Sequence, residues 1–247
     1  MTKLLPDFSL VLACYNEEPI LERSVREIFR ILDALRSTSE IIFVDDASSD
    51  RTSCIIDDII IANPHREIRK IAHSQNVGRG GAVSDGIRVA RGRFVGFIDI
   101  DLEVPAQYIL PCLLALEQGY EVATAFRIYK LHIGSLHRYV MSRGYRALLK
   151  WKIDAPLKDT ETGYKFFRSE RILPILNQVQ DQGWFWDTEI MVRAHFARLR
   201  IIEIPALHER NQDSPSSVKV FHDSWMYLKK LYQFSRTLSE FKDRRPQ

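Results

Sequence analysis

The stretch Arg93-Phe-Val-Gly-Phe-Ile98, which runs directly into Asp99-Ile-Asp-Leu-Glu103, decides the fold class of this chain. A short run rich in apolar, aromatic and β-branched side chains predicts a buried strand. In an open parallel sheet, ligands collect at the carboxyl ends of the strands. Acidic residues in that position therefore predict a functional site at one edge of a sheet.

Short apolar runs and amphipathic helical patterns alternate through the first half of the chain. Strands are predicted at residues 8–14, 40–44, 67–72, 93–98 and 121–125, and helices at 18–36, 51–62, 80–90 and 105–116. This alternation is typical of an α/β fold with a mostly parallel central sheet flanked by helices. With 247 residues, we expect one catalytic domain over residues 1–215, followed by a C-terminal amphipathic helix and tail over residues 216–247.

The composition excludes several classes of protein. Apolar residues make up 45% of the chain and charged residues 27%, which is typical of a folded domain. The net charge of +3 gives no reason to expect nucleic acid as a partner. Cys14, Cys54 and Cys112 lack C-x-x-C spacing, so we expect neither a disulfide framework nor a zinc knuckle. The sequence has no run of about 20 apolar residues and no apolar leader, which predicts a cytoplasmic protein.

Two segments combine basic and apolar residues at helical spacing. Residues 122–153 contain Lys and Arg but no Asp or Glu, and their amphipathic part covers about 127–152. Residues 217–247 repeat the combination. Packing against the sheet and contact with an anionic membrane surface both agree with these patterns. Membrane contact would make the protein peripheral on the cytoplasmic face, within reach of a separate membrane-embedded partner.

The acidic residues after the strand at 93–98 suit a metal ion. Asp99, Asp101 and Glu103 alternate along the chain, so they share one face if the backbone stays extended beyond Ile98. Converging carboxylates repel one another unless they are protonated or bind a metal. Hard oxygen ligands suit Mg²⁺ or Mn²⁺. We therefore expect these three side chains to hold one divalent ion.

Two other stretches follow predicted strands. Of Asp45 and Asp46, one is expected to form a turn or to cap the next helix, and the other to accept hydrogen bonds from a base or a ribose. The glycine-rich stretch 76–82 precedes a helix but lacks both G-x-G-x-x-G and G-K-[ST], and the chain contains no G-x-S-x-G. A Rossmann dehydrogenase, a P-loop NTPase and an α/β-hydrolase are therefore excluded.

The ordered motifs resemble those of family 2 glycosyltransferases with the GT-A fold. They are LVLACYNEE (10–18), EIIFVDDASSDRT (40–52), NVGRGGAVSDGIRVARG (76–92) and FIDIDLEVP (97–105). The motifs DTETGYKFF (159–167), GWFWDTEI (183–190) and SSVKVFHDS (216–224) resemble the branch of dolichyl-phosphate mannose and glucose synthases and bacterial polyprenyl-phosphate glycosyltransferases. The likeness covers nearly the whole chain. It departs from the family pattern at Ala13, where Pro is usual, and at Arg79, where Lys is usual.

The resemblance implies how the sugar donor is held. Tyr15, Glu17 and Asp45 would hold its nucleotide, with Asp46 and Arg79 as further substrate-binding positions. Asp99 and Asp101 would bind the ion that bridges the diphosphate. Glu103 stands where relatives often have Gln.

The resemblance also implies how the acceptor is met. Arg127 and Arg138, with Arg210 and Lys219, resemble the cationic groups that meet the donor diphosphate and a lipid phosphate. Asp159 and Asp187 are expected either to orient the sugar or the acceptor, or to serve the structure alone.

The reaction that follows from the resemblance is transfer of a hexose, with inversion, from a nucleoside-diphosphate sugar of the UDP-glucose or GDP-mannose type to a polyprenyl or dolichyl phosphate. Three alternatives stay open. A family 2 enzyme that glycosylates a saccharide or protein hydroxyl would need a general base, for which Asp187 is the best choice. A sugar nucleotidyltransferase would need a G-x-G-T-R-like loop, which is missing. A catalytically silent membrane-associated protein is disfavoured by the intact pair of Asp99 and Asp101.

Overall fold

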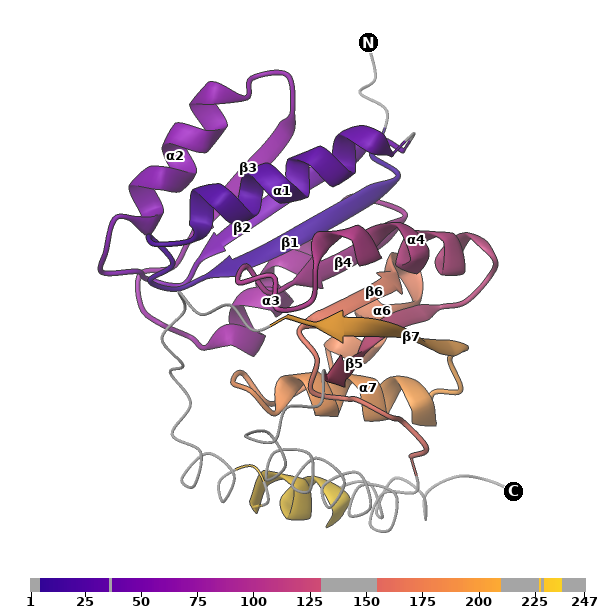
Figure 1. Cartoon of the computed structure of the whole chain (residues 1–247). Helices are drawn as coiled ribbons and strands as arrows, with labels where there is room; N and C mark the ends of the chain where they lie inside the picture. Colours follow the sequence, from indigo (N-terminus) through magenta and orange to yellow (C-terminus); the bar gives the residue numbers. More distant parts are fainter. Residues whose placement is uncertain (1–4, 36, 130–154, 210–226, 228, 237–247) are drawn as a thin grey trace.

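The computed structural model describes residues 5–35, 37–129, 155–209, 227 and 229–236. Within them, seven strands form a single sheet in the order β3-β2-β1-β4-β6-β5-β7 (Figure 1). All neighbouring strands pair in parallel except β6, which runs antiparallel to both β4 and β5. The predicted mostly parallel sheet is confirmed. The strands are β1 (Phe8–Cys14), β2 (Ser39–Asp45), β3 (Glu67–Ala72), β4 (Phe94–Ile98), β5 (Val122–Tyr129), β6 (Tyr164–Arg168) and β7 (Ile201–His208).

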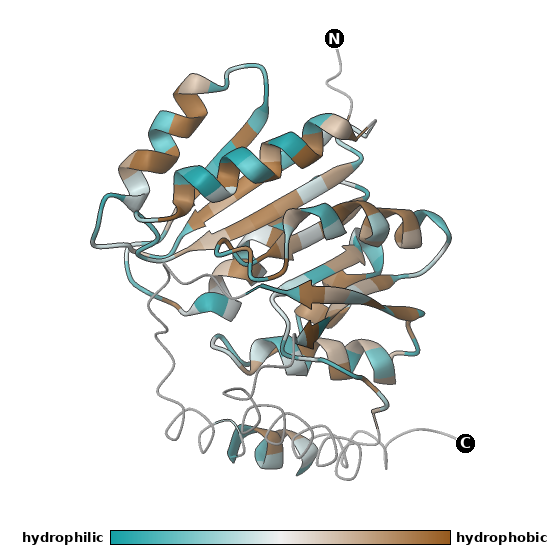
Figure 2. Ribbon diagram, in the orientation of Figure 1, coloured by the Kyte–Doolittle hydropathy of each residue, from teal (hydrophilic) through white to brown (hydrophobic). Residues whose placement is uncertain are grey.

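Helices cover both faces of the sheet. One hydrophobic cluster joins α1, α2 and α4 to side chains such as Leu12 of β1, and a second joins α3, α6 and α7 to side chains such as Val11. Neighbouring residues of β1 thus serve opposite cores, which explains why its sequence is a continuous apolar run. In Figure 2 the central strand β1 is mostly brown, whereas a helix such as α1 carries both brown and teal residues. The helices are α1 (Leu21–Ala34), α2 (Thr52–Ala62), α3 (Arg79–Val89), α4 (Ile109–Glu117, after a 3₁₀ turn at Ala106–Tyr108), α6 (Ser169–Leu176) and α7 (Trp186–Phe196).

The second half of the sheet contains strands that the sequence patterns did not predict. The sequence patterns predicted neither β6 nor β7, and they ended β5 at residue 125, whereas it continues to Tyr129. The first residues of the predicted basic amphipathic segment at about 127–152, residues 127–129, belong to this strand. They pair with residues 206–208 of β7, and this ladder takes up part of their backbone hydrogen bonding. The rest of that segment, residues 130–154, lies outside the described residues.

A C-terminal helix, described at residues 229–236, packs against the body of the protein. Its side chains Leu231 and Phe234 are buried in a cluster with Phe185 and Val192. Lys230 makes an ion pair with Asp181 in the loop before α7. The apolar side of residues 229–236 is therefore packed in a core, but against α7 and the residue before it and not directly on the sheet. The division into 1–215 and 216–247 stays a prediction.

Across the described ranges, none of the helices combines the length and the apolar character needed to cross a membrane.

Candidate active site

The loops that follow β1 and β2 are tied together at the carboxyl edge of the sheet. The backbone N–H of Asn16 donates to Ser48 Oγ at 3.0 Å, and the backbone N–H of Ser49 donates to Asn16 Oδ1 at 2.8 Å. The backbone N–H of Glu17 donates to Thr52 Oγ1 at 2.8 Å. Asn16 adopts a left-handed φ of 57°, which Asn tolerates better than most residues. Tyr15 is left half exposed beside Glu17.

Asp46 holds the glycine-rich loop in place. Its two carboxylate oxygens accept hydrogen bonds from the backbone N–H groups of Val77 and Gly78, each at 2.9 Å, and His73 Nδ1 lies 2.8 Å from Oδ1. Asp46 is buried, with only 2% of the residue exposed. Asp46, predicted to bind substrate, is therefore occupied by protein groups. Asp45 Oδ1 accepts from the backbone N–H of Ser48 at 3.1 Å, so Asp45 also forms a turn.

The backbone turns after Asp99 and does not stay extended as predicted. The N–H of Asp99 makes a last bond to the carbonyl of Gly163, at 2.9 Å, and the N–H of Leu102 then donates back to the Asp99 carbonyl at 3.2 Å. Leu102 has a left-handed φ of 53°. The reason for the turn is that β6 ends its pairing with β4 at Ile98, so no partner strand continues the ladder.

Asp99, Asp101 and Glu103 nevertheless line one pocket, together with Arg127 and His208. The Glu103 carboxylate is paired with a histidine and lies 3.0 Å from His208 Nε2. Among the described residues, no group of three or more His, Cys, Asp or Glu side chains is arranged to hold a metal ion. The predicted three-carboxylate ligand set is thus not assembled here.

Burial and neighbouring negative charges raise the pKa values of two carboxylates around this pocket. Burial, then Asp101, Asp99 and Asp50, raise the pKa of Glu17 from 4.5 to about 7. Burial, then Asp99, raise the pKa of Asp101 from 3.8 to about 6. Carboxylates that disfavour their own charge in this way bind a cation favourably, since the cation removes the repulsion.

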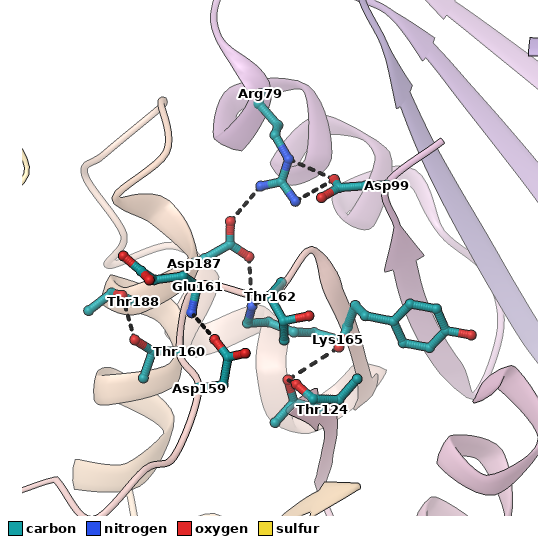
Figure 3. Close-up of polar contacts among 12 residues, drawn as sticks. Arg79, Asp99, Thr124, Asp159, Thr160, Glu161, Thr162, Lys165, Asp187 and Thr188 are labelled. Atoms are coloured by element: carbon teal, nitrogen blue, oxygen red, sulfur yellow. Dashed lines mark hydrogen bonds and ion pairs between the residues drawn. The ribbon is translucent and has the colours of Figure 1, made fainter. Parts of the chain in front are cut away.

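Four charged side chains form a chain of alternating sign beside the pocket (Figure 3). Lys165 Nζ lies 2.7 Å from Asp187 Oδ1. The other oxygen of Asp187 accepts from Arg79 Nη1. Arg79 in turn donates from Nε and Nη2 to Asp99 Oδ1, at 2.8 and 2.6 Å. The chain joins β6, α7, α3 and the end of β4.

Asp159 does for Arg127 what Asp187 does for Arg79. It accepts from the backbone N–H, Nε and Nη2 of Arg127 at 3.0, 2.8 and 2.9 Å. Although burial would raise it, Arg127 holds the pKa of Asp159 below its usual value. The sequence left open whether Asp159 and Asp187 orient a substrate or only support the structure. In the structure, each of these carboxylates orients an arginine. Arg138, Arg210 and Lys219 lie outside the described residues.

Several residues of the site were missed at the level of sequence. Lys165 is the main one, since its side chain is fully buried. A signal was present, because a lysine within Tyr-Lys-Phe-Phe, between apolar neighbours, indicates a buried ion pair. Trp184 was missed too; it is 54% exposed, and its ring centroid lies 5.3 Å from the Arg79 guanidinium carbon.

Hydroxyl groups connect this region to the C-terminal helix. Thr160, next to Asp159, and Thr188, next to Asp187, place their Oγ1 atoms 2.7 Å apart. Thr188 also bonds the hydroxyl of Tyr227. The residues beside both arginine-binding carboxylates are therefore linked to one another and to the C-terminal segment.

Known proteins resemble this chain in sequence and in fold. Glycosyltransferase AglD of Haloferax volcanii is 30% identical over 213 residues, covering 84% of this chain and 34% of AglD. The dolichyl-phosphate beta-glucosyltransferase of Saccharomyces cerevisiae is 30% identical over 218 residues, covering 80% of this chain and 65% of that enzyme. This chain thus spans about a third of the first relative and just under two thirds of the second.

A solved structure confirms the GT-A fold. Glucosyl-3-phosphoglycerate synthase from Mycobacterium tuberculosis, in complex with Mn²⁺, UDP and glucosyl-3-phosphoglycerate, superposes with a TM-score of 0.62 at 21% identity. The likeness covers 94% of this chain and 76% of that one. The profile described as glycosyl transferase family 2 matches residues 9–184, from β1 to the loop before α7. The resemblance drawn from the motifs is confirmed, and the chain belongs to glycosyl transferase family 2.

Proposed function

We propose that this protein transfers a hexose, with inversion, from a nucleoside-diphosphate sugar to a polyprenyl or dolichyl phosphate. One observation carries the proposal: an acidic pocket is lined by Arg127, which Asp159 orients, and by Asp99, whose carboxylate is bound to Arg79. Arg79 is itself held by the buried Asp187. Such a site offers places for a divalent ion and for two kinds of phosphate. The family membership supports glycosyl transfer, and the name of the yeast relative supports a lipid phosphate as acceptor.

The donor would lie along the carboxyl edge of the sheet. Tyr15 and Glu17, on the loop after β1, and Asp45, after β2, are proposed to hold its nucleotide. Tyr15 is half exposed and offers a ring on which a base can stack. Asp46 is left out of this set because its oxygens are bound to the glycine-rich loop.

The acidic residues fit a divalent ion, Mg²⁺ or Mn²⁺. Burial first, and neighbouring carboxylates second, raise the pKa values of Glu17 and Asp101, so a cation beside them would stabilise their charged forms. Asp99 and Asp101 are proposed as its ligands, and Glu103, bound to His208, as a support for their loop. When bound, the ion supplies positive charge that stabilises the departing diphosphate.

The arginines would stabilise the negative charge that moves during the reaction. Arg127 lines the pocket and is fixed by Asp159, so it can donate to a phosphate without first having to be ordered. Planar guanidinium groups match phosphate oxygens well. Arg79 is proposed to act from the donor side through its contact with Asp99.

The acceptor would need no strong base. A phosphomonoester has a second pKa of about 6, so it is mostly dianionic near neutral pH and its oxygen can attack the anomeric carbon directly. Asp187, the base that a hydroxyl acceptor would require, is only 2% exposed and is bound by two cations. This geometry favours a phosphate acceptor over a saccharide or protein hydroxyl.

The test is a transfer assay with UDP-glucose or GDP-mannose as donor, Mn²⁺, and either a polyprenyl phosphate or a simple oligosaccharide as acceptor. We expect a glycolipid product with the polyprenyl phosphate, abolished by EDTA. Transfer to the oligosaccharide alone would overturn the proposed lipid-phosphate acceptor. The absence of both turnover and donor hydrolysis would support a catalytically silent protein.

We further propose that the protein works at the cytoplasmic face of a membrane, where a separate membrane-embedded partner could meet it. The support is the run of basic residues without acidic ones at 122–153. Co-sedimentation with anionic vesicles should be seen at low salt and be lost at high salt. Binding that does not depend on anionic lipid would refute this part of the proposal.

A further inference from the structure

The side chain of Lys165 places an ammonium group inside the protein, where burial of a charge is costly. It lies on β6, between Tyr164 and Phe166 in the middle of the sheet, and its side chain is fully buried. Burial lowers the pKa of Lys165 below its usual value, with Asp187 acting in the opposite direction. Replacing a buried ion pair by apolar residues is often neutral or stabilising. Stability alone therefore gives a weak reason for a lysine at this position.

The partners of Lys165 give a better reason. Its Nζ donates to the carbonyl of Thr162 and to Asp187 Oδ1, so two acceptors fix the ammonium group. Asp187 uses its other oxygen for Arg79. A carboxylate held at both oxygens by different cations has one orientation, and in that orientation it meets Arg79.

Arg79 transmits this orientation to the pocket. Its guanidinium is bound by Asp187 on one side and by Asp99 on the other, and its exposed fraction is only 14%. Asp99 is 39% exposed and lines the pocket. Lys165 itself does not line the pocket, and three contacts separate it from the carboxylate that does.

We propose that Lys165 is a positioning residue for the donor site, holding Asp187 so that Arg79 keeps Asp99 oriented toward a nucleoside diphosphate and its divalent ion. The inference rests on the proposed function, since it assumes that Asp99 meets the donor. Without Lys165, the Oδ1 atom of Asp187 loses its cation and the carboxylate is free to rotate. Arg79 would then shift toward Asp187 and release Asp99.

The test compares Lys165→Met with a matched control, Arg69→Met. Glu40, like Asp187, is a buried carboxylate between two cations, here Arg69 and Arg91. It lies at the start of β2, at the opposite edge of the sheet from the pocket. Both substitutions remove one of two cations around a buried carboxylate. The two cases differ in the remaining cation: beside Asp187 it is Arg79, which contacts Asp99, whereas beside Glu40 it is Arg91.

Binding of UDP and of GDP, each with Mn²⁺, is measured by calorimetry on the full chain, and the donor KM and kcat are measured beside it. We expect Lys165→Met to weaken nucleotide binding and to raise the donor KM, each by about tenfold, while Arg69→Met changes neither. A merely structural role would lower the melting temperature in both variants and leave the Kd of the folded protein unchanged.

Lys165→Gln is the second variant, because it keeps a hydrogen-bond donor near Asp187 without the charge. It is expected to weaken binding less than Lys165→Met does. Unchanged binding in folded Lys165→Met would overturn the inference, and so would a failure of both variants to fold, which would assign Lys165 to folding. A wild-type chain that binds neither nucleotide with Mn²⁺ would instead overturn the proposed function.

Discussion

Arg79 donates two hydrogen bonds to a single oxygen of Asp99, from Nε at 2.8 Å and from Nη2 at 2.6 Å. Both bonds end on Oδ1, and this arrangement fixes the direction of the other oxygen, Oδ2. That oxygen lies over the backbone of Gly163, where an added Cβ would stand only 1.7 Å from it. The pair therefore depends on a neighbouring residue that has no side chain.

Gly163→Ala should impair transfer more than it impairs folding. The new Cβ would also lie 2.4 Å from Arg79 Nη2, so the methyl group displaces both members of the pair. Because the displaced atoms are side-chain ends, we expect a cost of about 1–3 kcal/mol in the free energy of unfolding. We expect a loss of about a hundredfold in kcat/KM, since fixed charges in an active site are worth about that much.

The control for this substitution is Gly183→Ala, where the nearest atom would be Asp181 Oδ1 at an ordinary 3.5 Å. Steady-state kinetics and chemical denaturation of both variants make the comparison. Equal kinetics in the two alanine variants would contradict the importance of the Arg79–Asp99 pair.

Asp101→Asn should abolish divalent-ion-dependent transfer and leave the fold intact. The substitution removes one negative charge from a group of carboxylates that raise one another's pKa values, so the metal-free protein should be as stable as the wild type or more stable. Kinetics across a Mn²⁺ titration, with circular dichroism as a check of folding, measure both expectations. Near-normal turnover in this variant would refute the metal assignment.

Much of the fold could be predicted from local patterns, because β1 to β4 and their helices repeat one unit of strand and helix. The acidic residues after β4 were found for the same reason, since they directly follow an apolar strand. The turn at Leu102 could not be found in this way. It follows from where pairing with the antiparallel strand β6 ends, which is at Ile98 opposite the first residue of β6, Tyr164, and β6 comes from a distant part of the sequence.

The pairing of the site's charges was beyond local patterns as well. Arg79 and Asp187 are 108 residues apart, and only the packing of α3 and α7 on the same face of the sheet brings them together. The sequence indicated that Asp187 was important but could not distinguish a general base from a partner of Arg79. Those two roles differ only in what surrounds the carboxylate.

The stability of the metal-free protein should fall as the pH rises from about 4.5 to about 7. The pKa of Glu17 is about 7 in the folded chain and 4.5 by default, so over this range the folded state keeps a proton that the unfolded state has lost. Unfolding then releases a proton, and the free energy of unfolding decreases with rising pH. Denaturant titrations at several pH values, with EDTA present, measure the slope.

Glu17→Gln should reduce this slope and leave the smaller part that Asp101 contributes, since the pKa of Asp101 is also raised, to about 6. Glu22→Gln, on the exposed side of α1, should leave the slope unchanged. Adding Mn²⁺ near neutral pH should raise the stability of the wild type, because a ligand that binds only the folded state stabilises it. A slope as steep in Glu17→Gln as in the wild type would show that other groups cause it.

Leu231→Ala should destabilise the whole protein if the C-terminal helix belongs to its core. Leu231 is only 2% exposed and shares a cluster with Phe185 and Val192, so its truncation leaves a cavity that typically costs about 2–5 kcal/mol. Tyr232→Ala, at a 56% exposed neighbour on the same helix, serves as the control and should cost less than 1 kcal/mol.

The same substitution, Leu231→Ala, should also affect catalysis. Because the cluster includes Phe185, directly before α7, a loosened C-terminal helix should raise the donor KM through Asp187 and Arg79. Thermal unfolding and donor kinetics without lipid measure both effects. If the helix instead serves only to contact a membrane, Leu231→Ala will leave stability and kinetics unchanged and will reduce vesicle binding alone.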